Sequence, residues 1–81
     1  MRQVEGTEST LARRIEEIRR KRFGHNGTAL LAAQLNLPAR TWENFESGVT
    51  IHGHVLLAFI ERTGASPHWL LTGEGPMYTG R

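Results

Sequence analysis

Cysteine is absent from the 81-residue chain. Without a thiol the chain can form neither a disulfide framework nor a thiolate metal site, so its apolar core has to hold the fold. A chain of this length is close to the lower limit for a single core, and it buries roughly 60–65% of the surface of its unfolded state. We therefore expect one domain of modest stability, which a partner subunit would stabilise further.

Long apolar runs are also missing, and no segment has the charged, apolar and small-residue regions of a secretory signal. These features mark membrane-spanning helices and exported proteins, respectively. The sequence therefore indicates neither membrane association nor export, and a cytoplasmic location is the expectation.

The excess of basic over acidic residues is small, 10 against 8, which gives a net formal charge of +2. The basic residues are concentrated in residues 13–22, and few of them follow Arg40. One end of the folded chain should therefore be electropositive, which suits an anionic partner. The charge run is equally consistent with a solvated helix face on which Glu16 and Glu17 balance the arginines.

Apolar residues recur at helical spacing in most of the chain, and no segment shows the alternation with period two that strands require. Helices are expected over residues 9–22, 28–35, 38–47, 54–64 and 67–73. The domain should span residues 9–78, between a flexible arm of residues 1–8 and a tail of residues 79–81. Short helices with short connections favour a compact all-α domain.

Several residues mark the expected helix ends. Asn36 tolerates the left-handed conformation that ends a helix, and Pro38 blocks continuation of the second helix and opens the third. Gly48 ends the third helix. Ser66 and Pro67 form an N-cap and first-turn pair for the last one.

The second and third helices have the length signature of a helix-turn-helix, with the turn at residues 36–38. Ala32 is small where the two helices would cross closely, and Leu37 is apolar where the turn has to pack. Trp42 and Phe45 are three residues apart, so both should face the core. Short helix pairs are common, and these details rather than the spacing support the motif.

Residues 31–48, LAAQLNLPARTWENFESG, and residues 66–77, SPHWLLTGEGPM, resemble the lambda-repressor-like, or xenobiotic-response-element-type, helix-turn-helix proteins, especially the phage-repressor branch. The resemblance covers residues 11–78 and implies a compact five-helix DNA-binding domain with its helix-turn-helix at helices two and three. It implies a transcription regulator, a repressor that binds a palindromic operator in double-stranded DNA as a homodimer. Such a protein would be bacterial or phage-encoded and associated with the nucleoid. The resemblance also implies an ion pair between Arg19 and Glu46.

The third helix would read bases in the major groove with its exposed face, which carries Ala39, Arg40, Glu43 and Asn44. Arg40 can donate two parallel hydrogen bonds to guanine, and Asn44 can bond adenine in the same bidentate way. Glu43 can accept from the amino group of cytosine, and Ala39 can touch a thymine methyl group. The alternative is a solvated face with contacts at i,i+3 and i,i+4. Within this motif base contact is favoured for Arg40 and Asn44, and it is left open for Glu43 because phosphates repel a carboxylate.

Phosphate contacts are expected from a second set of residues around the start of the second helix and on the third. They are Asn26, Thr28, Thr41 and Arg22. These contacts would position the protein without specifying a base sequence.

Metal binding and catalysis are not expected. His52 and His54 alternate in sequence, but no cysteine or aspartate is present to complete a metal site with them. No serine has a visible base and orienting group. We therefore expect a protein without metal or cofactor that is not an enzyme, and in which both histidines lie at a helix start.

An apolar surface is predicted near the C-terminus, where Leu70, Leu71, Met77 and Tyr78 would form an isologous dimer interface. The alternative, weighed almost equally, is that the tail folds back over its own core. A second hypothesis for function also stays open: a protein-interaction module with the same fold, such as an antitoxin or a phage-encoded antagonist, that binds a regulatory protein partner.

Overall fold

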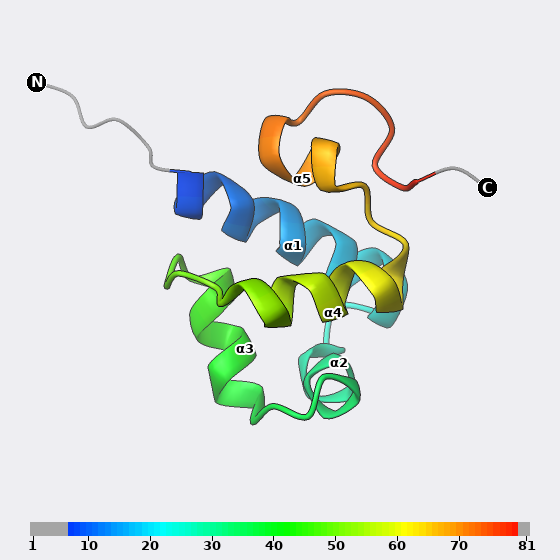
Figure 1. Cartoon of the computed structure of the whole chain (residues 1–81). Coiled ribbons are helices and arrows are strands. Elements are labelled where there is room, and N and C mark those ends of the chain that lie inside the picture. The colour runs from blue at the N-terminus through cyan, green and yellow to red at the C-terminus, as the bar shows by residue number, and fades with distance from the viewer. Residues whose placement is uncertain (1–6, 80–81) are drawn as a thin grey trace, which may run out of the picture.

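The computed structural model describes residues 7–79, which fold into five helices without a strand. These are α1 (Thr7–Phe23), α2 (Thr28–Gln34), α3 (Ala39–Glu46), α4 (Gly53–Thr63) and α5 (Pro67–Thr72). Helix α1 runs through the middle with α4 in front of it, α5 lies on one side of this pair, and α2 and α3 lie on the other (Figure 1).

The all-helical prediction is confirmed for the described residues, and each helix boundary lies within two residues of its expected position. One boundary needs correction. Residues 7 and 8, which were assigned to a flexible arm, belong to the first turn of α1. The rest of that arm and the last two residues of the tail, 80 and 81, lie outside the described residues.

Three aromatic side chains form the centre of the core. The ring of Trp42 stacks on Phe59 with centroids 5.1 Å apart, and it meets the ring of Phe45 edge-on at 5.9 Å. From α1, Ile15 and Ile18 are buried in the same cluster. Trp42 and Phe45 therefore face inward, as their spacing predicted, and they fix α3 against α1 and α4.

The connection between α2 and α3 is a tight turn in which Asn36 takes a left-handed conformation with φ of 60°. The amide of Leu37 donates to the carbonyl of Ala32 at 2.9 Å, and the amide of Asn36 donates to Ala33 at 3.1 Å. These bonds satisfy the last carbonyls of α2. Pro38 then precedes α3 in an extended conformation that proline adopts without strain. Asn36 thus takes the predicted conformation, whereas Pro38, predicted as the first residue of the third helix, lies just before it.

The C-terminal segment after α5 folds back along the connection between α4 and α5. The amide of Ser66 donates to the carbonyl of Met77 at 2.9 Å, and the amide of Thr79 donates to Gly64 at 2.8 Å. Met77 and Tyr78 pack partly buried against the core. This arrangement is the alternative in which the tail covers its own domain.

Of the interface predicted from Leu70, Leu71, Met77 and Tyr78, the structure exposes only a part. Leu70 is only 1% exposed because α5 presents it to the core, so it is inaccessible to a partner. Met77 and Tyr78 are engaged with their own domain. Only Leu71 is prominently exposed among the four.

Gly27, just before α2, is a position where a side chain cannot fit. A Cβ atom built there would lie 2.2 Å from the carbonyl oxygen of Phe23 and 2.5 Å from its Cβ. Gly53, at the start of α4, is a matched control because a Cβ there would meet nothing within 4 Å. We expect Gly27→Ala to lower the free energy of unfolding by about 1–3 kcal/mol through overpacking. Gly53→Ala should raise it by about 0.4–1 kcal/mol by restricting the unfolded chain. Urea denaturation followed by circular dichroism measures both, and equal effects at the two positions would contradict the packing around Gly27.

Candidate nucleic-acid interface

The outward face of α3 carries three polar side chains that share one side of the helix. Arg40, Glu43 and Asn44 are all exposed, and their spacing of three and four residues aligns them. Ala39 differs from them, because it is half-buried and packs against the core. Among residues 7–79, no salt bridge includes Arg40 or Glu43. These side chains are thus presented to solvent and available to a ligand, whereas Ala39 is available only in part.

A buried ion pair fixes the orientation of α3. Glu46 in its last turn accepts hydrogen bonds from Arg19 Nε at 2.9 Å and from Arg19 Nη2 at 2.8 Å. The indole Nε1 of Trp42 donates to the same carboxylate at 2.6 Å. The hydrogen bond from Arg19 to Glu46 raises the pKa of the guanidinium above its usual value, against the opposing effect of burial. The pair expected between Arg19 and Glu46 is therefore present, and it has a third member that sequence reasoning missed.

Arg19 also holds the loop between α1 and α2. Its Nη1 donates to the carbonyl of Gly24 at 3.0 Å and to the carbonyl of His25 at 2.7 Å. The arginine therefore connects α1, this loop and, through Glu46, the end of α3. This network holds α3, and with it the outward face of that helix, in place. Among the described residues every buried polar side-chain atom has a hydrogen-bond partner.

The residues expected to contact phosphates occupy different positions. Asn26 is exposed in the loop before α2, and Thr28 is the half-buried first residue of that helix. Thr41 is half-buried on α3. Arg22, although exposed, has its guanidinium carbon 5.5 Å from the centroid of the Tyr78 ring, a cation–π contact that the sequence analysis did not predict. Arg22 is thus directed toward the C-terminal tail rather than toward α3.

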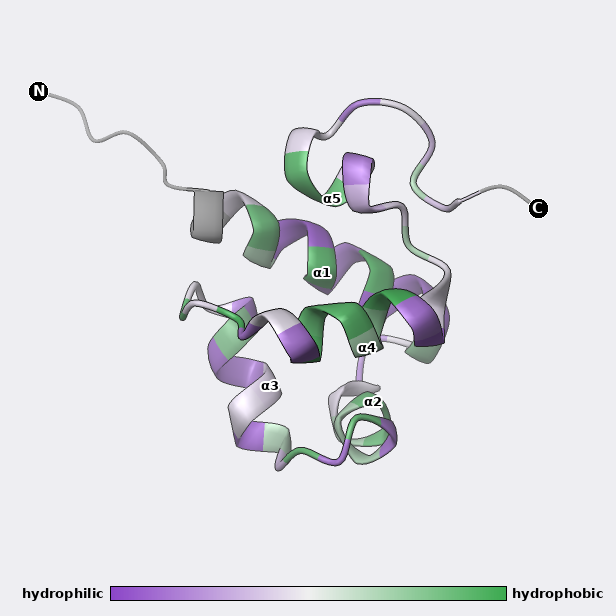
Figure 2. Ribbon diagram, in the orientation of Figure 1, coloured by the Kyte–Doolittle hydropathy of each residue, from purple (hydrophilic) through white to green (hydrophobic). Residues whose placement is uncertain are grey.

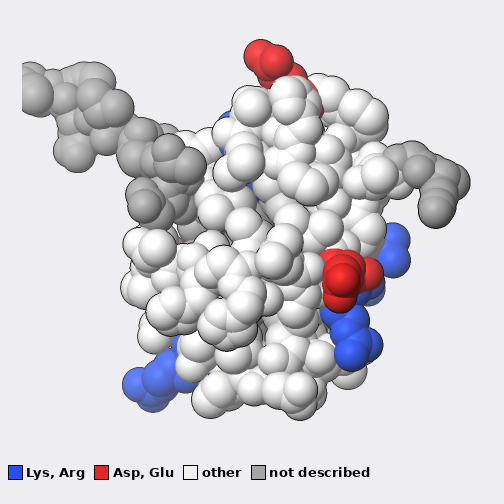
Figure 3. Space-filling view, in the orientation of Figure 1, with Lys and Arg blue, Asp and Glu red and all other residues white. Residues whose placement is uncertain are grey.

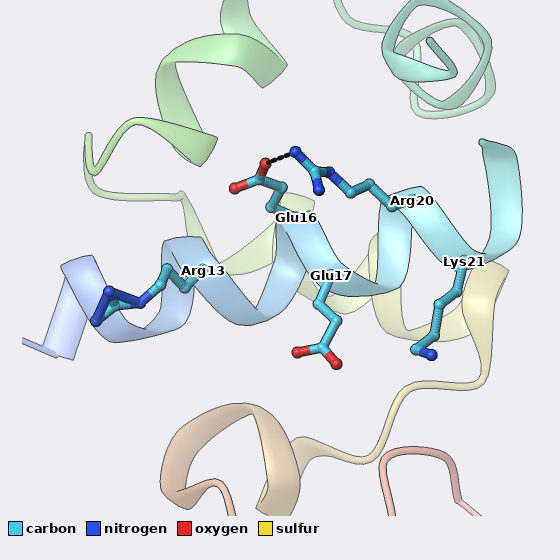
Figure 4. A pocket seen from close by; sticks show the side chains of 5 residues that line it. All are labelled: Arg13, Glu16, Glu17, Arg20 and Lys21. Carbon is cyan, nitrogen blue, oxygen red and sulfur yellow. Dashed lines mark ion pairs between the residues drawn. The ribbon is translucent and has the colours of Figure 1, made fainter. Parts of the chain in front are cut away.

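The basic stretch on α1 forms a surface of mixed charge. A hollow of about 350 Å³ is lined from this single helix by residues of both signs: Arg13, Glu16, Glu17, Arg20 and Lys21. Glu16 turns toward Arg20 and pairs with it at 3.0 Å, while Glu17 and Lys21 lie on another side of the helix (Figure 4). The alternation of charges supports the solvated-face interpretation of this stretch over a strongly electropositive one.

A second hollow, of about 360 Å³, lies between α1 and α5 and includes Arg14 and Trp69. The Arg14 Nη1 donates to the carbonyl of Leu70 at 3.0 Å. This arginine thereby satisfies a carbonyl near the end of α5 and joins the last helix to the first. Its role in the structure is to connect helices.

No family model, curated protein or solved structure matches the chain. Within the described part of the chain, no helix has the length and apolar character needed to cross a bilayer.

The histidines at the start of α4 pack against each other. The rings of His52 and His54 are stacked with centroids 5.9 Å apart, and His52 meets Phe45 edge-on at 6.3 Å. His52 is the residue that precedes the helix, as expected from the sequence. No group of three or more potential metal ligands occurs among residues 7–79. The pair is best described as part of the packing between the end of α3 and the start of α4.

Proposed function

We propose that this chain is a sequence-specific DNA-binding transcription regulator, a repressor that uses α2, the turn at Asn36 and α3 as a helix-turn-helix. The observation that carries the proposal is the outward face of α3. It presents Arg40 and Asn44 to solvent at adjacent positions on a helix that a buried network holds in place.

The shape of α3 fits the proposed role. An α-helix with its side chains is about 10–12 Å across, and the major groove of B-DNA is about 12 Å wide. Only an exposed helix can enter the groove, and α3 lies at the edge of the domain with its outward side uncovered by another helix (Figure 1). In this arrangement α2 would lie across the backbone while α3 enters the groove.

The chemistry of the α3 face also fits base edges. Arg40 can donate to both O6 and N7 of guanine, and Asn44 can both donate to and accept from adenine. Glu43 can accept only, so its one good base partner is cytosine, and it would repel the backbone elsewhere. Asn26, Thr28 and Thr41 are then the candidates for phosphate contact, and Arg22 is not among them because it packs on the tail.

Arg40→Ala should weaken binding to a preferred DNA site by about 5- to 150-fold, which corresponds to about 1–3 kcal/mol for one bidentate base contact. Binding to random DNA should weaken much less, since one phosphate contact at most is lost. The site would be selected from random duplexes, and fluorescence anisotropy at one stated salt concentration would measure both dissociation constants.

Arg62→Ala is the matched control for this experiment. Arg62 is another exposed arginine, in the last turn of α4 at the end far from α3 (Figure 1). The substitution Arg62→Ala removes the same charge from the domain. It should therefore change the dissociation constants for the preferred site and for random DNA only slightly and by equal factors. If Arg40→Ala lowers both affinities equally, base reading by Arg40 is wrong; if no sequence is enriched, specific DNA binding itself is wrong.

A protein-interaction module is the second candidate, and one observation favours it. In the view with α4 in front, Figure 3 shows charged side chains around the margins and an uncharged central surface. Salt separates the two functions, because DNA binding releases counterions and weakens steeply with ionic strength, whereas docking of apolar surfaces does not.

A further inference from the structure

Helix α4 exposes an apolar residue that the fold of the domain does not explain. Leu57 is 64% exposed, more than the other exposed large hydrophobic residues, which are Leu30 at 55%, Val49 at 54% and Leu71 at 57%. Leu71, the remaining exposed member of the interface predicted from the sequence, lies on α5. The two leucines thus mark different helices as possible contact surfaces.

The residues around Leu57 form a stripe along the outward side of α4. His54, Leu57, Ala58 and Glu61 follow the i, i+3, i+4, i+7 spacing of one helix face. His54 and Glu61 are exposed and Ala58 is half-exposed. Figure 2 shows α4 hydrophobic along its middle and hydrophilic toward both ends, and the surface over it in Figure 3 is uncharged at the centre.

We propose that a second copy of this chain docks on the α4 stripe, with the two α4 helices antiparallel and a twofold axis passing between Leu57 and Ala58. In this arrangement Leu57 of each copy lies against the partner's Ala58. His54 and Glu61 are each three and a half residues from the axis, in opposite directions along the helix. Each His54 therefore lies beside the partner's Glu61, and symmetry makes this contact twice.

The stripe complements itself, and for this reason the occupant is a second copy rather than another protein. A small residue at Ala58 leaves room for the partner's large Leu57, which lets the helix axes approach closely. The imidazole of His54 can donate to, or when protonated pair with, the partner's Glu61 carboxylate. A parallel arrangement would instead place each Glu61 beside the partner's Glu61, so the charges also select the antiparallel orientation.

Within its own domain, His54 has one described aromatic neighbour, the stacked ring of His52. The stacking positions the His54 ring at the beginning of the stripe. A single helix stripe buries less than the roughly 1,200 Å² of a stable interface, so the free protein should dimerise weakly.

This inference rests on the proposed function in that it supplies a contact surface for the homodimer expected from the sequence, but it is tested on the free protein without DNA. Sedimentation equilibrium over tens to hundreds of micromolar protein would measure the dimer dissociation constant. Leu57→Asp should raise that constant at least tenfold. Leu71→Asp, which places the same charge on a similarly exposed leucine of α5, should leave it unchanged.

A charge exchange tests the orientation. His54→Glu places a carboxylate beside the partner's Glu61 at both ends of the stripe and should raise the dissociation constant at least tenfold. Adding Glu61→Lys to the same chain restores opposite charges and should return the constant to within about threefold of the original. The substituted residues of both experiments are all exposed: His54, Leu57, Glu61 and Leu71. Circular dichroism would verify that each variant folds.

Three outcomes would overturn the proposal: a strictly monomeric protein across the concentration range, a Leu71→Asp effect as large as that of Leu57→Asp, or a double variant no tighter than His54→Glu alone. A monomer that still selects a DNA sequence would remove the α4 interface and keep the proposed function. A dimer that selects no DNA sequence would keep the α4 interface and remove the proposed function.

Discussion

Glu46→Ala should lower the free energy of unfolding by about 3–5 kcal/mol, the cost of removing one partner from a buried ion pair. The side chains of Arg19 and Glu46 are only 7% and 11% exposed, so the guanidinium would remain in a poorly hydrated place without its carboxylate. The indole N–H of Trp42 would lose its acceptor as well. A domain of this size has a total stability of about 4–12 kcal/mol, so the variant should be close to unfolding at 37 °C.

Urea denaturation followed by far-ultraviolet circular dichroism measures this loss. Glu43→Ala is the control, because it removes an exposed glutamate from the same helix and should change stability by no more than about 0.5 kcal/mol. The double variant Arg19→Met with Glu46→Leu should be more stable than Glu46→Ala, since it leaves neither charge behind. A double variant less stable than the single one would show that the network stabilises the fold by more than avoiding an unpaired charge.

As a separate single variant, Trp42→Ala should also lower the free energy of unfolding by about 3–5 kcal/mol, because the indole is completely buried. The substitution removes the ring that stacks on Phe59 and meets Phe45, and so it leaves a cavity between α3 and α4. Trp42→Phe keeps most of the apolar contact but removes the donor to Glu46. It should cost less, about 1–3 kcal/mol.

The control for both is Trp69→Phe, a change at the other tryptophan of the chain, which is half-buried on α5. It should cost less than Trp42→Phe. Thermal unfolding monitored by circular dichroism gives the comparison. Equal stabilities for Trp42→Phe and Trp69→Phe would show that the hydrogen bond from the indole to Glu46 contributes nothing measurable.

The helices and their ends were predictable because their signals are local. Asn36, Pro38 and Ser66 act through their own backbone preferences or through bonds to residues at most a few positions away, so each marks a boundary without knowledge of the rest of the fold. Trp42 and Phe45 were assigned to the core from spacing alone, and the structure buries both.

The tail was not predictable in the same way. Met77 and Tyr78 lie in a glycine-rich segment without periodicity, and their burial depends on backbone bonds to Gly64 and Ser66. The sequence does not say whether such apolar residues cover their own domain or a partner's, because both arrangements bury the same side chains. The contact between Arg22 and Tyr78 could not be predicted from the sequence either, because it depends on the path of the tail.

At the candidate site, exposure was predictable and packing was not. The helical spacing of Arg40, Glu43 and Asn44 placed all three on the outward face of α3, where the structure has them. Ala39 was placed with them, yet it lies partly against the core because the first turn of α3 is close to α2. The hydrogen bond from Trp42 to Glu46 joins residues four positions apart on one helix, a spacing that the sequence itself shows.

The bond from Arg14 to the carbonyl of Leu70 has a consequence for how a cell makes this protein. The two residues are 56 positions apart, and they join the first helix to the last. During synthesis at about 5–20 residues per second, α1 emerges several seconds before the helix that covers it. The apolar side of α1 therefore stays exposed to chaperones and to other nascent chains until α5 has left the ribosome and can pack on it.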